Sequence, residues 1–319
     1  MPLHHSSGRW RLGLSLALVT TSLWGVLPIA LKIALQAADV YTVTWFRFLG
    51  SFLLLTVYLA GRGGLPTWQK LRSARLELLA TATLFLAINY LFYLVGLNFT
   101  SPTNSQVIIQ LAPVFFGVGA LTIFRERYTL RQWLGMATLS LGLSLFFNDQ
   151  LEALTSAPGQ YLLGSGLLVL AALVWAVYAL AQKQLLQQLP SSAIMWVIYG
   201  GSALLFTPPA SPEQLIALTP LQWGMLIFSA LNTFIAYGAF AEALDHWEAS
   251  RVSAVLSLTP IITLVSVAAG SWLYADWIEA EQITAIGLVG AVLVVMGSLS
   301  VALGRSEETR PAIKSASSR

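Results

Sequence analysis

The chain has no cysteine among its 319 residues. Disulfide bonds and thiol chemistry are therefore excluded. Histidine is almost as scarce, with His4 and His5 near the start of the chain and His246 between apolar segments. A catalytic site or metal centre would need several such groups at one depth. We therefore expect no enzyme, no metal and no cofactor.

Charge is the second shortage. Only 10% of the residues are charged and 56% are hydrophobic, with a mean hydropathy of +0.72, whereas soluble domains carry about 25% charge. Long windows contain no Asp, Glu, Lys or Arg, and the longest, 78–124, has room for two membrane-spanning helices of about 20 residues each. The composition predicts an all-α integral membrane protein whose main partner is the lipid bilayer.

Turn residues divide the apolar sequence into ten expected transmembrane helices. They are placed near 11–35, 41–60, 76–97, 103–124, 130–147, 160–182, 192–209, 220–243, 252–274 and 282–303. The first apolar run continues to Leu31 without a small-residue cleavage site. We therefore interpret it as an uncleaved first span rather than a signal peptide.

Basic residues predict the orientation of these helices. With the N-terminus in the cytoplasm, 15 of the 17 Lys and Arg residues fall in cytoplasmic segments, and the other two, Lys32 and Arg47, lie inside helices. Such a bias is typical of cytoplasmic loops. It predicts a multi-pass protein of the plasma membrane, in a bacterium the inner membrane, with both termini cytoplasmic. The net charge of +3 then requires no nucleic-acid partner.

The sequence also repeats itself. Three ordered blocks recur with shifts of 151, 147 and 155 residues. The matches are Trp24, Lys32, Trp45 and Gly50 with Trp175, Lys183, Trp196 and Gly201; Tyr90, Leu97 and Pro113 with Tyr237, Leu244 and Pro260; and Glu126, Thr129, Gly135 and Gly142 with Glu281, Thr284, Gly290 and Gly297. Each copy holds five helices, an odd number, so the second copy enters the membrane from the opposite side. Inverted repeats of this kind are typical of secondary transporters.

This duplication gives the expected domain organisation. A cytoplasmic tail (1–10) precedes the first repeat (11–148), an outer linker (149–159), the second repeat (160–303) and a disordered cytoplasmic tail (304–319). An insertion at 272–280 lengthens the outer end of helix nine relative to its counterpart in the first repeat.

Several residues form a pattern that points to one family. They are Trp24-Gly25 to Lys32, Arg47, Ala112-Pro113, the turn at 124–127 and Gly135 with Gly142, followed more loosely by Trp175 to Lys183, Thr259-Pro260, Glu281, Gly290 and Gly297. This pattern resembles the EamA domain of the drug/metabolite transporter superfamily. The resemblance implies two inverted five-helix EamA-type repeats that form an exporter or exchanger of small metabolites.

Helices four and nine each carry a polar face that ends at a proline. The members are Gln106, Gln110 and Pro113, and their repeat mates Ser253, Ser257 and Pro260. Proline disturbs the carbonyl four residues earlier, at Ile109 and Leu256, which then needs a partner or a cavity. We predict that the two glutamines and Ser257 line a substrate cavity and that the two prolines act as hinges. The alternative is that these residues only join and bend helices.

Amides and aromatic residues near the helix centres are further candidates for the cavity. They are Asn89 and Tyr93 in helix three, Trp24 in helix one, Trp175 and Tyr178 in helix six, and Asn232 and Tyr237 in helix eight. Amides can orient a neutral or zwitterionic metabolite while rings bury its apolar part. Since Trp and Tyr also occur as packing residues and interfacial belts, that alternative stays open for each.

Charges inside the bilayer are costly and usually face protein or water. Arg47 either contacts a substrate anion or bonds helix-end carbonyls. Lys32 and Lys183 are interpreted as gate or interface anchors near opposite membrane faces. Glu126 and Glu281 precede helices five and ten, where a carboxylate satisfies free amides, so we predict that they are structural caps.

No Asp, Glu or His is expected near the centre of a helix, and Glu242 comes closest, near the cytoplasmic end of helix eight. Because proton relays normally use such groups, we expect facilitated export or exchange rather than tight proton symport.

The sequence thus predicts an inner-membrane secondary transporter of small organic metabolites, with amino acids as one candidate class, working by alternating access. A nucleotide-sugar or phosphate-ester exchanger is an alternative that would need several cations. A non-transporting receptor or assembly protein is another. The glycines of helices five and ten permit close contact within one chain or between two copies in a homodimer.

Overall fold

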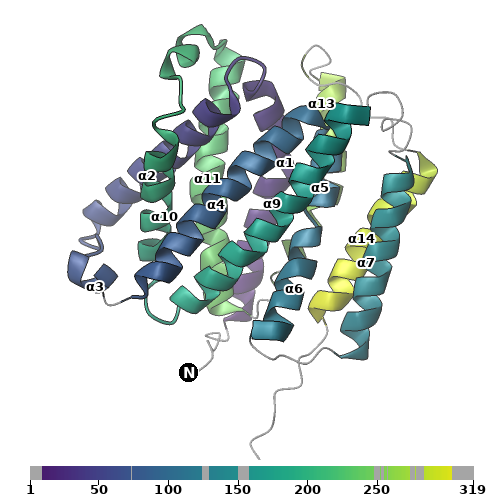
Figure 1. Ribbon diagram of the computed structural model, residues 1–319, viewed down its shortest axis with the longest axis horizontal. Coiled ribbons are helices and arrows are strands. Elements are labelled where there is room, and N and C mark those ends of the chain that lie inside the picture. Colours follow the sequence, from purple (N-terminus) through teal and green to yellow (C-terminus); the bar gives the residue numbers. More distant parts are fainter. Residues whose placement is uncertain are drawn as a thin grey trace, which may run out of the picture.

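The computed structural model describes residues 9–72, 74–123, 129–149, 158–247, 252, 255–256, 258–273, 277 and 284–303. Throughout these residues the regular structure is helical, without a strand. This confirms the all-α fold class (Figure 1).

Each of the ten predicted ranges contains an α-helix. The helices are α1 (Trp10–Ala34), α2 (Val40–Gly61), α3 (Trp68–Arg72), α4 (Leu76–Phe99), α5 (Pro102–Ile108), α6 (Leu111–Ile123), α7 (Leu130–Asp149), α9 (Pro158–Leu185), α10 (Ser191–Phe206), the 3-10 helix η1 (Pro212–Ala217), α11 (Pro220–His246), α13 (Thr259–Leu273) and α14 (Ala285–Leu303). By length and composition, α1, α2, α4, α9 and α11 can each cross a membrane, and α10, α13 and α14 are shorter apolar helices. The short helices α3 and η1 were not predicted.

Helix starts follow local capping chemistry. The Asp39 side chain accepts a hydrogen bond from the Thr42 amide at 2.8 Å and so caps α2. At α11, Thr219 and Gln222 form a capping box, in which each side chain bonds the backbone of the other. These side chains satisfy amides that have no partner within the helix.

Helix four is broken rather than continuous. A turn at Ile109 and Gln110 separates α5 from α6, because Pro113 has no amide hydrogen to donate to the Ile109 carbonyl. In the second repeat, Val255 and Leu256 are helical, Leu258 lies in a turn, and α13 then begins one residue before Pro260. Both repeats therefore have a turn shortly before the proline that they share, whereas the predicted range 103–124 was a single helix.

The two repeats are interleaved. Helix α1 packs on α11, α4 on α9, α2 on α10, and α7 on α14. The first helix of each repeat (α1 or α9) therefore packs on the third helix of the other repeat (α11 or α4). The second helices of the two repeats, α2 and α10, pack on each other, and so do the fifth helices, α7 and α14. The packing therefore follows the two-repeat architecture, with the main contacts running between copies.

Helices α7 and α14 lie side by side at one edge of the bundle (Figure 1). A Cβ atom added to Gly142 would lie 2.5 Å from the Val294 nitrogen and 2.7 Å from the Gly290 oxygen, and one added to Gly297 would strike the Leu139 backbone. Glycine is therefore required for this backbone contact. These glycines face each other within one chain.

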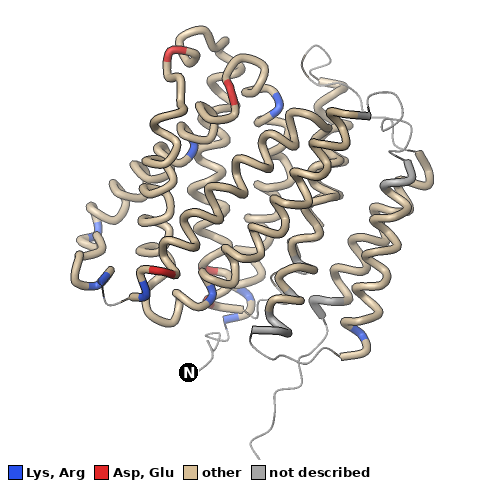
Figure 2. The backbone as a smooth tube through the Cα atoms, in the orientation of Figure 1, with Lys and Arg blue, Asp and Glu red and all other residues tan. Residues whose placement is uncertain are grey.

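Basic residues gather at the end of the bundle where α1 begins (Figure 2). Arg9 precedes α1 and Arg11 lies in its first turn, Arg62 follows α2, and Arg75 precedes α4. The middle part of the bundle, between its two ends, carries few charged residues (Figure 2).

Candidate functional site

A cavity of about 110 Å³ lies between helices of both repeats. Eight of the predicted residues line it: Trp24, Arg47, Asn89, Tyr93, Gln106, Gln110, Trp175 and Tyr237. Tyr90 and Thr259 also line it and were not among the predicted site residues. The repeat pairing of Tyr90 with Tyr237 was the signal that marked Tyr90, whereas Thr259 was marked only by its place before Pro260.

The two helix breaks form part of the cavity wall. Ile109 and Gln110 come from the first break, and Leu256 and Thr259 from the second. The carbonyl of Ile109 accepts from the Ala112 amide at 2.9 Å, and the carbonyl of Leu256 accepts from the Thr259 hydroxyl. The disturbed carbonyls are thus satisfied locally, beside a cavity, as such groups require.

Gln106 and Gln110 differ in how they are held. Pro28 in α1 cannot donate to the Trp24 carbonyl, and the Gln106 side chain takes its place with a hydrogen bond of 2.9 Å. Gln106 therefore joins two helices as well as lining the cavity. Gln110 is 4% exposed, and its side-chain amide makes no hydrogen bond with any residue that the structure describes. Its amide is therefore available to a ligand.

Two cross-repeat contacts show the pseudo-symmetry at atomic detail. The Asn89 side chain donates to the Ala171 carbonyl at 2.9 Å, and the Thr20 hydroxyl donates to the Ala236 carbonyl at 3.2 Å. The shifts of 151 and 147 residues relate Thr20 to Ala171 and Asn89 to Ala236. The two contacts therefore join symmetry-related helix pairs, and the first repeat supplies the donor in both, from α4 in one and from α1 in the other.

Tyr178 and Asn232 lie outside the cavity lining. Tyr178 is fully buried, with its hydroxyl 3.8 Å from the Met195 sulfur. Asn232 is 1% exposed, and its side chain donates to the Leu23 carbonyl at 2.6 Å. Both make the helix–helix contacts that the packing alternative described.

Arg47 is a buried cation in the cavity wall. It is 2% exposed, and its Nε donates to the Thr233 hydroxyl at 3.1 Å. Its guanidinium carbon lies 4.4 Å from the centre of the Tyr90 ring, a cation–π distance. The hydroxyl of Thr233 in turn donates to the Ser229 carbonyl at 2.9 Å. No pattern in the sequence marked Thr233.

Aromatic rings form a continuous cluster against the cavity. Trp24 lies 5.0 Å from Tyr237, 5.6 Å from Phe240 and 6.5 Å from Trp175 between ring centres. Phe240 lies one turn beyond Tyr237 toward the end of α11 and does not line the cavity. The cluster therefore continues from the cavity lining toward the end of α11.

The comparisons with known proteins agree with this geometry. The model of the EamA-like transporter family matches residues 11–148 and 162–303. The chain belongs to the EamA-like transporter family. The resemblance seen in the sequence is thereby confirmed.

Relatives of this EamA-like transporter carry transporter names. An uncharacterized transporter of Haemophilus influenzae is 36% identical over 293 residues, which cover 92% of this chain and 95% of that protein. The uncharacterized inner membrane transporter YhbE of Escherichia coli K12 is 37% identical over 294 residues, 92% of each. A probable amino-acid metabolite efflux pump of Salmonella typhimurium is 24% identical over 299 residues, 88% of this chain and 92% of that protein.

A solved crystal structure shares the fold of this EamA-like transporter. It has a TM-score of 0.64 and 16% identity, and the match covers 93% of this chain and 96% of that one. The family, the relatives and the apolar helices together show a multi-pass membrane transporter protein.

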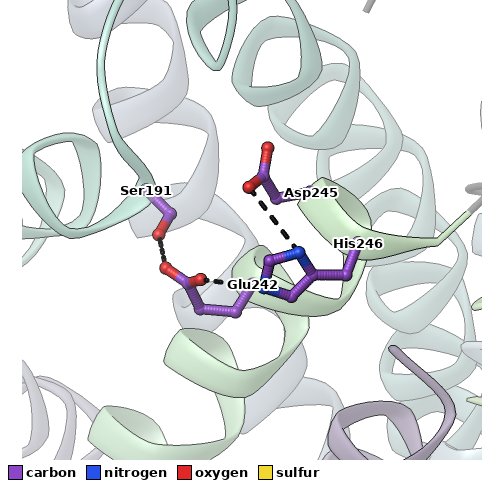
Figure 3. A network of polar contacts seen from close by, with 4 residues as sticks. All are labelled: Ser191, Glu242, Asp245 and His246. Carbon is purple, nitrogen blue, oxygen red and sulfur yellow. Dashed lines mark hydrogen bonds and ion pairs between the residues drawn. The ribbon is translucent and has the colours of Figure 1, made fainter. Parts of the chain in front are cut away.

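The EamA-like transporter has a second polar cluster at the end of α11 (Figure 3). Ser191, the first residue of α10, donates to Glu242, and His246 lies 3.8 Å from Glu242 and 3.9 Å from Asp245. The two carboxylate side chains are 48% and 47% exposed. None of these residues lines the cavity. The cluster ties α10 to α11 rather than building the site.

The remaining predictions fall at other places in the EamA-like transporter. Ser257, Glu126 and Glu281 lie outside the described residues. Pro113 belongs to the first turn of α6, and Pro260 is buried at the start of α13. Of the insertion at 272–280, Trp277 packs against a cluster that includes Ile29 and Ile33 of α1.

Lys32 anchors a helix end in this EamA-like transporter. Its Nζ donates to the carbonyls of Leu97, Asn98 and Thr100 at 2.9–3.0 Å. These carbonyls lie at the C-terminus of α4, where a cation is favourable.

Proposed function

We propose that this EamA-like protein is an inner-membrane secondary transporter, an exporter or exchanger of small organic metabolites. Amino acids and their metabolites are the first class to test. One observation carries the proposal: a cavity between the two repeats, lined by both proline-associated helix breaks. Substrate sites of inverted-repeat transporters lie at such discontinuous helices, at the interface of the repeats.

The lining chemistry suits a small organic solute. Trp24, Trp175 and Tyr237 supply ring surfaces, while Gln110 supplies an amide without a partner among the described residues. Sites for small molecules are mostly apolar with a few placed polar groups. The name of the Salmonella relative, a probable amino-acid metabolite efflux pump, supports the choice of the first class.

Phosphate esters and nucleotide sugars fit the cavity less well. Among its described lining residues, Arg47 alone is a cation, and phosphate groups generally bind several charged donors. The same lining holds no Asp, Glu or His, which supports facilitated export or exchange rather than proton symport.

The expected cycle alternates access at the two breaks. Pro113 and Pro260 serve as hinges, and the aromatic cluster around Trp24 closes the cavity toward the cytoplasm. The basic end of the bundle faces the cytoplasm, by the positive-inside rule, with both termini on that side.

Efflux from proteoliposomes tests the proposal. The vesicles are loaded with labelled amino acids and other small metabolites, and wild type is compared with Gln110→Ala. A matched control is Gln160→Ala, in the exposed first turn of α9. We expect efflux of one solute class, reduced roughly 3- to 10-fold by Gln110→Ala through the loss of one hydrogen bond, and unchanged in the control.

Unlabelled solute outside distinguishes exchange from simple export, since exchange is stimulated by it. If folded wild-type protein gave no flux above that of empty liposomes, the result would favour a non-transporting receptor or assembly protein.

A further inference from the structure

We infer that Arg47 binds a carboxylate of the transported solute, so that the substrates are small solutes with one carboxylate group. The inference rests on the proposed function and names its substrate class. It starts from a buried cation in the cavity wall for which the described residues offer no carboxylate.

Most N–H donors of Arg47 make no hydrogen bond with a described residue. A guanidinium has five N–H groups in a planar fork, and only Nε bonds a described residue, Thr233. The buried side-chain atoms without a hydrogen-bond partner do not include either Nη atom of Arg47. Arg47 is one of the residues that line the cavity. The Nη donors therefore have no hydrogen-bond partner among the described residues, and we assign them a solute in the cavity as their partner. Such a fork matches the two oxygens of a carboxylate.

The described lining of the cavity contains no counter-ion for Arg47. None of its described lining residues is Asp or Glu, and the contacts of Arg47 are a hydroxyl and a ring face. A buried cation is costly unless it is paired. One monovalent anion neutralises the site, whereas a dianion leaves a charge uncompensated.

The repeat provides an internal comparison for the structural alternative. The shifts of 151 and 147 residues place Ile198 and Leu86 where the other half has Arg47 and Thr233. Both are fully buried in one hydrophobic cluster, and their helices, α10 and α4, pack together as α2 and α11 do. The same helix contact is therefore made without charge in this very chain. Helix packing therefore does not require a cation at this position. Arg47 differs from its repeat mate Ile198 in that it lines the cavity.

The rest of the wall fits the rest of such a solute. Tyr90 holds the guanidinium from one side, Gln110 offers a donor and an acceptor, and Trp24 with Trp175 gives a ring surface for an apolar group. An apolar group with one carboxylate uses all three features.

Binding to purified protein in nanodiscs tests the inference separately from flux. Leucine, phenylalanine, 4-methylpentanoate and phenylacetate are each compared with the corresponding carboxamide, by the shift in melting temperature. We expect at least one acid to stabilise wild type and its amide to do so roughly 10- to 100-fold less tightly, since a charged hydrogen-bond pair is lost.

The variants assign the effect to Arg47. Arg47→Gln loses the preference for the acid, and Arg47→Lys keeps part of it as a point charge. The double variant Arg47→Ile with Thr233→Leu copies the apolar pair of the other repeat, so we expect it to fold and to bind no acid. Arg62→Gln removes an exposed cation that caps the same helix and should match wild type.

Equal binding of acid and amide, binding by Arg47→Gln within twofold of wild type, or no binding of any acid to wild type would each overturn the inference. Acid binding without flux in proteoliposomes leaves the carboxylate site standing and removes the transport proposal. Flux of equal size in wild type and Arg47→Gln leaves the transport proposal standing and removes the carboxylate site at Arg47.

Discussion

Alanine at Gly290 should push α7 and α14 apart. The added Cβ would lie 2.6 Å from the Phe146 nitrogen and 2.8 Å from the Gly142 oxygen. Both neighbours are backbone atoms, which cannot rotate away as a side chain can. The helices must separate by about 0.8 Å before the nearer contact reaches the ordinary 3.4 Å.

The size of the effect follows from two opposing terms. Overpacking of this kind costs about 1–3 kcal/mol, while replacing glycine by alanine inside a helix gains about 1 kcal/mol. Gly166 of α9 isolates the second term, because a Cβ there meets nothing within 4 Å. Gly166→Ala therefore gains the propensity term alone, and the two variants should differ by about 1–3 kcal/mol.

The assay is unfolding of purified protein in mixed detergent with rising SDS, followed by loss of helical circular dichroism. We expect Gly166→Ala to be more stable than wild type and Gly290→Ala to be less stable than Gly166→Ala. The double variant Gly142→Ala with Gly290→Ala should cost less than the sum, because the first Cβ already separates the helices. Equal stability of Gly290→Ala and Gly166→Ala would refute the close backbone contact.

Three further predictions concern anchoring, orientation and coupling. Lys32→Met should destabilise the protein by about 1–2 kcal/mol in the same assay, since the C-terminus of α4 loses its cation; an unchanged unfolding curve would contradict the anchor. The chain has no cysteine, so Leu65→Cys and Ile216→Cys each introduce a single thiol in an exposed position; an impermeant maleimide on intact cells should label only Ile216→Cys, and the opposite pattern would reverse the orientation. Glu242→Gln should keep its solute efflux with or without a pH gradient, and flux that vanished in this variant and followed the gradient would indicate proton coupling instead.

The sequence predicted the parts of the fold that depend on composition and on proline. Charge-free windows marked the helices, the repeat marked the two halves, and Pro113 marked Ile109 as the place where a carbonyl loses its helical partner, although helix four was predicted as one continuous helix. Each of these signals acts along the chain, so no tertiary contact was needed to read it.

Helix rotation was harder to predict. Lipid tails and protein interiors are both apolar, so hydrophobic periodicity does not tell which face of a membrane helix looks inward. Tyr178 and Tyr237 illustrate the problem, because both are mid-helix aromatic residues and only Tyr237 lines the cavity. The partnership of Arg47 with Thr233 spans 186 residues and likewise follows from packing alone.

The interleaving of the two repeats decides which parts of the molecule travel together. Since α1 packs on α11 and α4 on α9, each packed pair contains one helix from each copy. A rearrangement that opens one side of the cavity would then move helices of both repeats together. We therefore expect mixed pairs of helices to move as units, so that the boundary between the duplicated sequences is not a boundary between moving bodies.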